Sequence, residues 1–141
     1  MLPVSFLSFL SFALVTLMGS VNGSGTIEFG QSTEHISVTA SGSTGRATFQ
    51  DRAAGGNVNG QIDIRCVTIV GNTATLSGIV THSNRKSLIG QEGVFRIVDN
   101  GKRGSDLASL INFHDVGIGT DCTAGEFDLT PVKGNFTVSG T

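Results

Sequence analysis

The sequence predicts an all-β fold, built as a single small antiparallel β-sandwich or β-barrel. Charged residues make up only 14% of the 141 residues, and the chain has 20 Gly but only 2 Pro. Short runs of alternating apolar and polar residues recur at intervals of about ten residues, separated by Gly- and Asn-rich turns. Beyond the N-terminal segment, no long stretch has helical periodicity. These features indicate one domain without helices.

The N-terminal segment, residues 1–23, is typical of a secretory signal peptide. Leu7 to Met18 is almost wholly apolar, and small residues follow it. The apolar run is shorter than the roughly 20 residues that a membrane-spanning helix needs, which favours a signal peptide over a membrane anchor. One feature departs from the signal-peptide pattern: no Lys or Arg precedes the apolar run. We expect cleavage after Gly23, with Gly19 or Ser20 as alternatives, and no stable membrane span afterwards.

The mature chain, residues 24–141, begins with a Gly- and Ser-rich segment, 24–33, that we expect to be only loosely extended. Residues 34–41 alternate cleanly between apolar and polar side chains, as a strand with one buried face does. A turn at 41–45 leads to a short strand, 46–50, and the turn-rich residues 53–60 follow.

Residues 61–70 form the clearest strand. Ile62, Ile64 and Cys66 share one face, but Val67 and Ile69 then fall on the other. This phase change predicts a β-bulge or a stretch that is buried on both sides.

The remaining strands follow the same logic. A Gly-Asn turn after residue 70 predicts that the next run returns as the antiparallel partner of 61–70. The candidate strands are 73–83, 93–98, 107–113 and 134–138.

Two cysteines, Cys66 and Cys122, lie in the mature chain. In an exported protein an even cysteine count indicates a disulfide, and only one intramolecular pairing exists here. The cysteines are far apart in sequence and form no CxxC motif, which disfavours a metal or redox pair.

The charge balance disfavours anionic partners. With a net charge of −2, we expect neither nucleic acid nor an anionic membrane to be held electrostatically. The basic pairs Arg85-Lys86 and Lys102-Arg103 follow successive antiparallel strands. They should therefore lie at opposite ends of the sheet.

No catalytic motif is present. The sequence lacks GxSxG and HExxH, and it lacks the Trp and Tyr that stack on sugars. The histidines are dispersed over three strand ends, at His35, His82 and His114. Four aspartates are scattered as well, at Asp99, Asp106, Asp115 and Asp121. We therefore predict no catalytic residue, no metal ligand, no cofactor-binding residue and no cofactor.

The loop after residue 98 carries the strongest turn signal. We expect Asp99, Asn100, Gly101 and Gly104 to form a structural turn between strands. Asn100 and Gly101 would adopt positive φ, and Asp99 would accept hydrogen bonds from nearby backbone N–H groups.

The alternative for this loop is a cation site. Oxygen donors are available from Asp99, Asn100, Ser105 and Asp106. The adjacent Lys102 and Arg103 would repel a divalent ion, so we favour the turn without metal.

Several motifs resemble a family of small bacterial secreted β-domains of unknown function, the post-COAP-type domains. The segments CVTIVGNTATLSGIVT, FRIVDNGKRG, DLASLINF, DC and GNFTV occur in the family's order. Lys102 and Arg103 replace the Glu and Pro of its DNGEPG loop. The resemblance implies an exported domain, found alone or appended to surface proteins, with no settled enzymatic activity. It also supports pairing Cys66 with Cys122.

We therefore expect a secreted, non-enzymatic β-domain with a structural, adhesive or ligand-binding role, as a cell-surface or matrix component with an unknown partner. One alternative is a small secreted hydrolase whose site is assembled from dispersed His and Asp residues. The other is a calcium- or carbohydrate-binding module.

Overall fold

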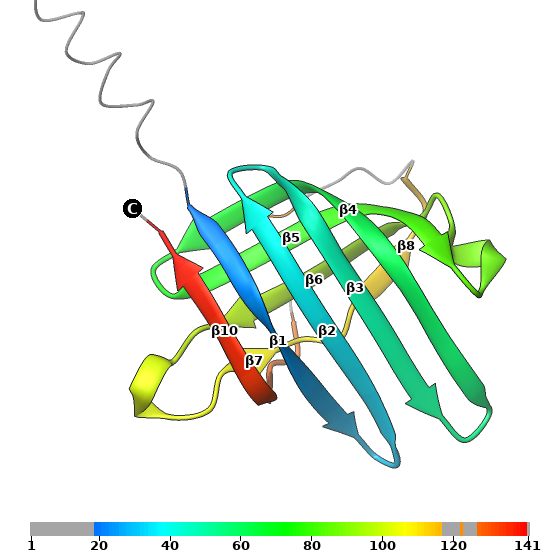
Figure 1. The fold of residues 1–141 in the computed structure, drawn as a ribbon, viewed down its shortest axis with the longest axis horizontal. Coiled ribbons are helices and arrows are strands. Elements are labelled where there is room, and N and C mark those ends of the chain that lie inside the picture. Colours follow the sequence, from blue (N-terminus) through cyan, green and yellow to red (C-terminus); the bar gives the residue numbers. More distant parts are fainter. Residues whose placement is uncertain (1–18, 117–121, 123–126, 141) are drawn as a thin grey trace, which may run out of the picture.

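The computed structural model describes residues 19–116, 122 and 127–140. These residues form a nearly closed antiparallel β-barrel, so the barrel rather than the sandwich is the architecture of this domain (Figure 1). Most of the expected signal peptide, residues 1–18, lies outside the described residues.

Ten strands and two short 3₁₀ helices make up the described fold. The strands are β1 (Ser20–Phe29), β2 (Ser32–Ser41), β3 (Thr44–Ala53), β4 (Gly56–Val70), β5 (Thr73–Ser83), β6 (Glu92–Val98), β7 (Leu107–Ala108), β8 (Asn112–His114), β9 (Thr130–Pro131) and β10 (Lys133–Ser139). The helices are η1 (Lys86–Leu88) and η2 (Gly101–Arg103).

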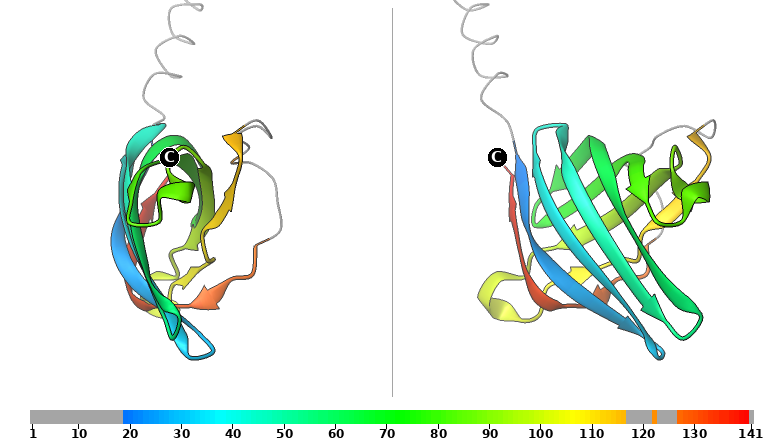
Figure 2. Two further views of the ribbon diagram at one scale, coloured as in Figure 1. Left: turned by 90° about the vertical axis from the view of Figure 1, so that its right-hand side faces the viewer. Right: turned by 45° about the vertical axis from the view of Figure 1, so that its right-hand side comes forward.

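The sheet order is β10-β1-β2-β3-β4-β5-β6-β7-β9, with β8 also paired to β6. Strands β1 to β6 therefore form a continuous antiparallel meander, and the last strand returns to lie beside the first. Figure 2 shows how this sheet curves round its interior. Because β10 pairs with β1 and Ser20 stands opposite Ser139, the first and last strands of the barrel meet on one side.

Two segments expected to be irregular are strands. Residues 24–33 were expected to be loosely extended, but β1 reaches Phe29 and pairs with β2 on one side and β10 on the other. Residues 53–60 were expected to be a turn, but β3 and β4 continue until only a two-residue turn remains. Pairing on both sides overrides the weak strand propensity of Gly, Ser and Asn.

One expected strand is interrupted. The run 107–113 was predicted to be continuous, but the structure divides it into β7 and β8. Between them, Ser109 forms hydrogen bonds with Arg96 of β6: its backbone N–H donates to the Arg96 carbonyl at 2.9 Å, and its Oγ accepts the Arg96 N–H at 2.9 Å. The side-chain bond replaces a backbone partner and ends the regular ladder.

Aliphatic and phenylalanine side chains fill the interior of the barrel. The largest fully buried ones are Phe95, Phe136, Ile27, Ile36, Ile62, Ile64, Leu76 and Ile97. They come from almost every long strand, so each strand contributes its inward face to one core.

The bulge predicted in residues 61–70 is confirmed. The register between β4 and β5 shifts between Ile64 and Cys66, which leaves Arg65 as the extra residue. Ile64 and Val67 consequently both face the core, and Cys66 points to the outside of the barrel.

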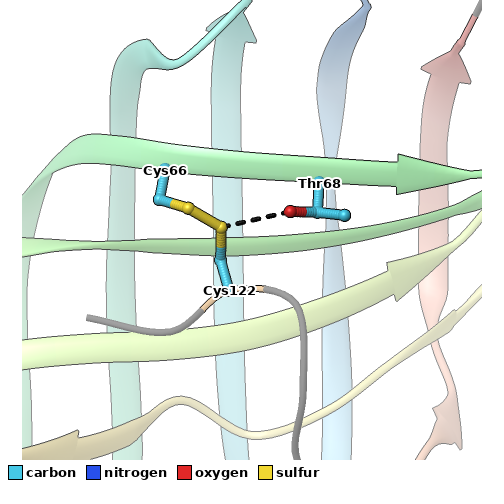
Figure 3. Close-up of a disulfide and its surroundings, with 3 residues drawn as sticks. All are labelled: Cys66, Thr68 and Cys122. Carbon is cyan, nitrogen blue, oxygen red and sulfur yellow. Dashed lines mark hydrogen bonds between the residues drawn. A yellow bond between two sulfur atoms is a disulfide. The ribbon is translucent and has the colours of Figure 1, made fainter. Parts of the chain in front are cut away.

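The disulfide between Cys66 and Cys122 is also confirmed, with a Cα–Cα distance of 6.0 Å. It ties Cys122 to the outer surface of β4, where the hydroxyl of Thr68 lies 3.2 Å from the Cys122 sulfur (Figure 3). The crosslink therefore holds a distant part of the chain against the barrel wall.

We predict that Cys66→Ser lowers the free energy of unfolding by roughly 2–5 kcal/mol. The bond closes a loop with a sequence separation of 56, which restricts the unfolded chain. Denaturant unfolding with and without reductant measures the effect. An equal stability of the wild-type protein in both conditions would contradict it.

Candidate functional site

The loop between β6 and β7 is more than a local turn, because its first aspartate reaches across to β10. Asp99 accepts the backbone N–H of Gly101 on Oδ1 at 2.8 Å, as expected for the turn. Its other oxygen, Oδ2, accepts the backbone N–H of Val138 at 3.0 Å. The carboxylate thus joins the loop to the last strand.

Asp106 repeats this arrangement at the other end of the loop. Its Oδ1 accepts the N–H of Asn100 at 2.9 Å, and its Oδ2 accepts the N–H of Phe136 at 2.7 Å. Its backbone carbonyl accepts the N–H of Val132 at 2.9 Å. We call the two carboxylates and the N–H groups they accept from β10 the seam. The seam closes the barrel between β10 and the loop after β6, where no backbone ladder joins β10 to β6.

The turn itself differs from the prediction at one residue. Gly101 has a φ of +58°, as expected, but Asn100 has a φ of −88° and remains in the right-handed region. Asn100 needs no positive φ because its N–H bonds Asp106 and its side-chain amide donates to the Ser105 carbonyl. Gly104 is extended, with a φ of 165°.

The hydrogen bonds of the seam occupy the carboxylate oxygens that a cation would bind. All four carboxylate oxygens of Asp99 and Asp106 already accept backbone N–H groups. Among the described residues, no group of three or more His, Cys, Asp or Glu is arranged to hold a metal ion.

We predict that Asp106→Ala lowers the free energy of unfolding by roughly 2–5 kcal/mol, since it leaves two N–H groups without their acceptor. Asp106→Asn, which keeps one acceptor oxygen, should lose less, and the exposed control Asp128→Ala should lose almost nothing. Thermal unfolding in 1 mM calcium and in chelator should give the same Tm for each protein. A calcium-dependent rise in Tm that Asp99→Ala removes would show instead that this loop is a metal site.

A second pair of carboxyl groups lies across β2 and β3. Glu34 is 2% exposed and stands opposite Asp51 in the ladder. Burial, followed by the hydrogen bond and charge of Asp51, raises the pKa of Glu34 to about 9, against a smaller lowering by the Ile111 N–H. Burial also raises the pKa of Asp51, while Glu34 and Arg85 oppose the rise. Glu34 is therefore a neutral hydrogen-bonding group near neutral pH.

Its hydrogen bond explains why such a residue is tolerated inside the barrel. Glu34 Oε1 accepts the N–H of Ile111 at 3.0 Å, in the interruption between β7 and β8. The buried acid thus anchors a segment that has lost its regular ladder.

We predict that stability falls as pH rises from about 5 to 9. The folded pKa of Glu34 lies above its ordinary value of 4.5, so the folded state holds the proton through this range and the unfolded state does not. The free energy of unfolding should fall by at most about 1.4 kcal/mol per pH unit from this group. Glu34→Gln, which mimics the neutral acid, should flatten the profile, whereas the exposed control Glu28→Gln should leave it unchanged. Denaturant unfolding at each pH measures the slope, and an unaltered slope in Glu34→Gln would refute the assignment.

The histidines separate into two groups. His114 Nε2 lies 3.1 Å from Glu92 Oε1, and Glu92 is fully buried where β6 pairs with β8. His114 Nδ1 lies 3.2 Å from the Asp115 backbone oxygen, so the carboxylate beside this imidazole belongs to Glu92. Asp115 is exposed, and Asp121 lies outside the described residues.

His35 and His82 lie on the outer surface of the barrel, on β2 and β5, with β3 and β4 between them. They line one shallow groove of about 460 Å³ that crosses β2 to β5. Its other lining residues are Thr48, Phe49, Gln50, Asn59, Gly60, Gln61 and Ser83. Hydroxyl, amide and imidazole groups therefore dominate this groove.

Two further grooves adjoin it. One of about 360 Å³ shares His35 and Gln50 with the first and adds Arg52. Another of about 480 Å³ shares Thr48 and adds Arg46 and Asp63 among its lining.

We call the outward side chains of β1 to β5 that line these three grooves the polar face. On β3 they alternate with Ala47 and Phe49, which are buried in the core. The polar face therefore consists of outward-pointing polar residues, which alternate with buried apolar residues in the pattern that predicted the strands.

The basic pairs lie where the strand order predicted. Arg85-Lys86 begins the connection from β5 to β6, and Lys102-Arg103 lies in the connection from β6 to β7. Because β5 and β6 are antiparallel, the two connections lie at opposite ends of β6 (Figure 1). Within the described part of the chain, no helix is long and apolar enough to cross a membrane.

No protein-family model, curated protein or solved structure matches this chain. The resemblance to post-COAP-type domains therefore stays a prediction that rests on the order of the motifs. Among the residues of the polar face, sequence reasoning singled out only the histidines. The polar positions of the alternating strands were the available signal for the others.

Proposed function

We propose that this protein is a secreted, non-catalytic binding module that attaches to a hydroxyl-rich polymer through the polar face. The observation that carries the proposal is the run of three adjoining grooves lined by hydroxyl, amide and imidazole groups. Such side chains donate and accept hydrogen bonds, as a polysaccharide does. A long shallow surface suits a chain better than a compact small molecule.

The distribution of acid and base groups supports binding over hydrolysis. Of these three grooves, the two that contain His35 contain no carboxylate, and the one that contains Asp63 contains no histidine. A hydrolase assembled from dispersed residues needs both groups at one place. The His114–Glu92 pair contributes to none of the three, and its carboxylate is buried.

Export belongs to the same proposal. The disulfide suits an oxidising compartment, and the apolar N-terminal run suits a signal peptide. Among the expected cleavage positions, a cut after Gly19 leaves β1 whole, whereas a cut after Gly23 would remove Val21, which is fully buried. We therefore favour the cut after Gly19, and N-terminal sequencing of the exported chain distinguishes the two.

Affinity electrophoresis in gels containing dextran, xylan or polygalacturonate tests the binding function. We expect at least one polymer to retard the native protein. The double variant His35→Ala, Gln50→Ala removes two groups shared by adjoining grooves and should weaken that binding about tenfold. The control Asn112→Ala changes an exposed residue of β8 and should bind like the wild type.

Two results would overturn the proposal. The first is that none of the polymers retards the protein. The second is that the double variant, still folded by circular dichroism, binds as tightly as the wild type.

A further inference from the structure

The acidic side chains of this chain are unevenly distributed. Of the 11 Asp and Glu residues, Glu34, Glu92 and Asp106 are buried, and Asp99 is half-buried in the seam. The seam carboxylates accept backbone N–H groups, and Glu34 is neutral near neutral pH. These four acids therefore lie in the interior or in the seam and not on the polar face, so the net charge of −2 does not describe the charge of that face.

The acids that do lie on the outer surface of β1 to β4 have basic partners. Glu28 Oε1 is 2.7 Å from the Lys133 ammonium group, and Asp63 is 3.6 Å from the Arg65 guanidinium. Across the described residues, Arg46 and Arg52 take part in no ion pair, although Asp63 stands opposite Arg46 in the ladder. Both arginines are exposed and line grooves of the polar face.

The two arginines stand at a defined spacing. They are six residues apart on β3 and project from the same face, so about 20 Å separates them. Thr48 and Gln50 lie between them on the same strand, and His35 lies beside Gln50 on β2. The arrangement is a strip with a cation near each end and neutral hydrogen-bonding groups in the middle.

We infer that the polymer bound by the polar face is an acidic polysaccharide that lies along β3, with anionic groups near Arg46 and Arg52 and hydroxyl groups over Thr48 and Gln50. This inference rests on the proposed function and adds the chemical class of the ligand. Guanidinium groups pair with carboxylate or sulfate groups in bidentate fashion, which gives the two ends of the strip their specificity.

The composition of the strip favours a polysaccharide over other polyanions. Binding of single-stranded nucleic acid relies on aromatic side chains that stack on the bases. Phe49 is the only Phe, Tyr or Trp that lines the three grooves, and it is 2% exposed and packed in the core. The strip between the arginines consists of polar groups that match sugar hydroxyls.

Isothermal titration with polygalacturonate oligomers and with dextran tests the inference. The wild-type protein should bind polygalacturonate more tightly than dextran. Arg46→Gln and Arg52→Gln keep most of the side-chain size and should each weaken binding of polygalacturonate about fivefold, with little change for dextran. Arg103→Gln, an exposed change on η2, is the matched control and should bind like the wild type.

The possible failures can be told apart. If dextran binds as tightly as polygalacturonate and the arginine variants bind normally, the inference is wrong while the proposed function stands. If neither of these polymers binds but xylan retards the protein in affinity electrophoresis, the inference is wrong while the proposed function stands. If none of the three polymers binds, both are wrong. Tighter binding of oligodeoxythymidylate than of polygalacturonate, lost in Arg46→Gln and Arg52→Gln, would identify nucleic acid as the occupant and overturn the inference.

Discussion

The closure of the barrel depends on the two carboxylates of Asp99 and Asp106. A curved antiparallel sheet that does not close exposes the N–H and C=O groups of its edge strands. In this barrel β10 pairs with β1 along one edge, while the edge of β6 is already occupied by β7 and β8. A complete ladder from β10 to β6 is therefore unavailable, and side-chain oxygens accept the N–H groups of Phe136 and Val138 instead. The same bonds fix the loop that carries the aspartates.

Much of the fold can be predicted from local sequence patterns, but the seam cannot. Alternation predicted the interior strands, the phase change at Cys66 predicted the bulge, and the cysteine count predicted the disulfide. The Asp-Asn-Gly motif correctly predicted a turn, but a motif of this kind is satisfied by local hydrogen bonds alone. The bond between Asp99 and Val138 joins residues 39 positions apart, and no local signal specifies such a partner. For the same reason β1 was missed: its Gly and Ser residues form a strand because both neighbours pair with it.

The polar face was only partly accessible to prediction, for a related reason. Alternation shows which side chains point outward, but strand register decides which of them become neighbours. His35 and His82 lie 47 positions apart and line one groove because the register of β2 to β5 places them at the same end of these strands. Arg52 was not recognised as part of a strand because the expected strand ended at residue 50, two residues before it. Sequence patterns therefore predicted the composition of the outer surface better than they predicted its grooves.

The seam and the interior also change how the net charge should be interpreted. A net charge of −2 suggested that anionic partners would find no electrostatic attraction. That argument treats the charge as evenly spread, but closing the barrel draws Asp99 and Asp106 into hydrogen bonds with the backbone, and burial keeps Glu34 protonated. The arginines of β3 have no comparable structural use and stay on the outer surface. The fold thus places the carboxylates of Asp99 and Asp106 in the seam and leaves the arginines on the outer surface. The reason is that carboxylates can accept the N–H groups of an unpaired strand edge and guanidinium groups cannot. A weakly acidic chain can therefore present a basic strip, and the sign of its ligand follows from that strip rather than from the whole-chain charge.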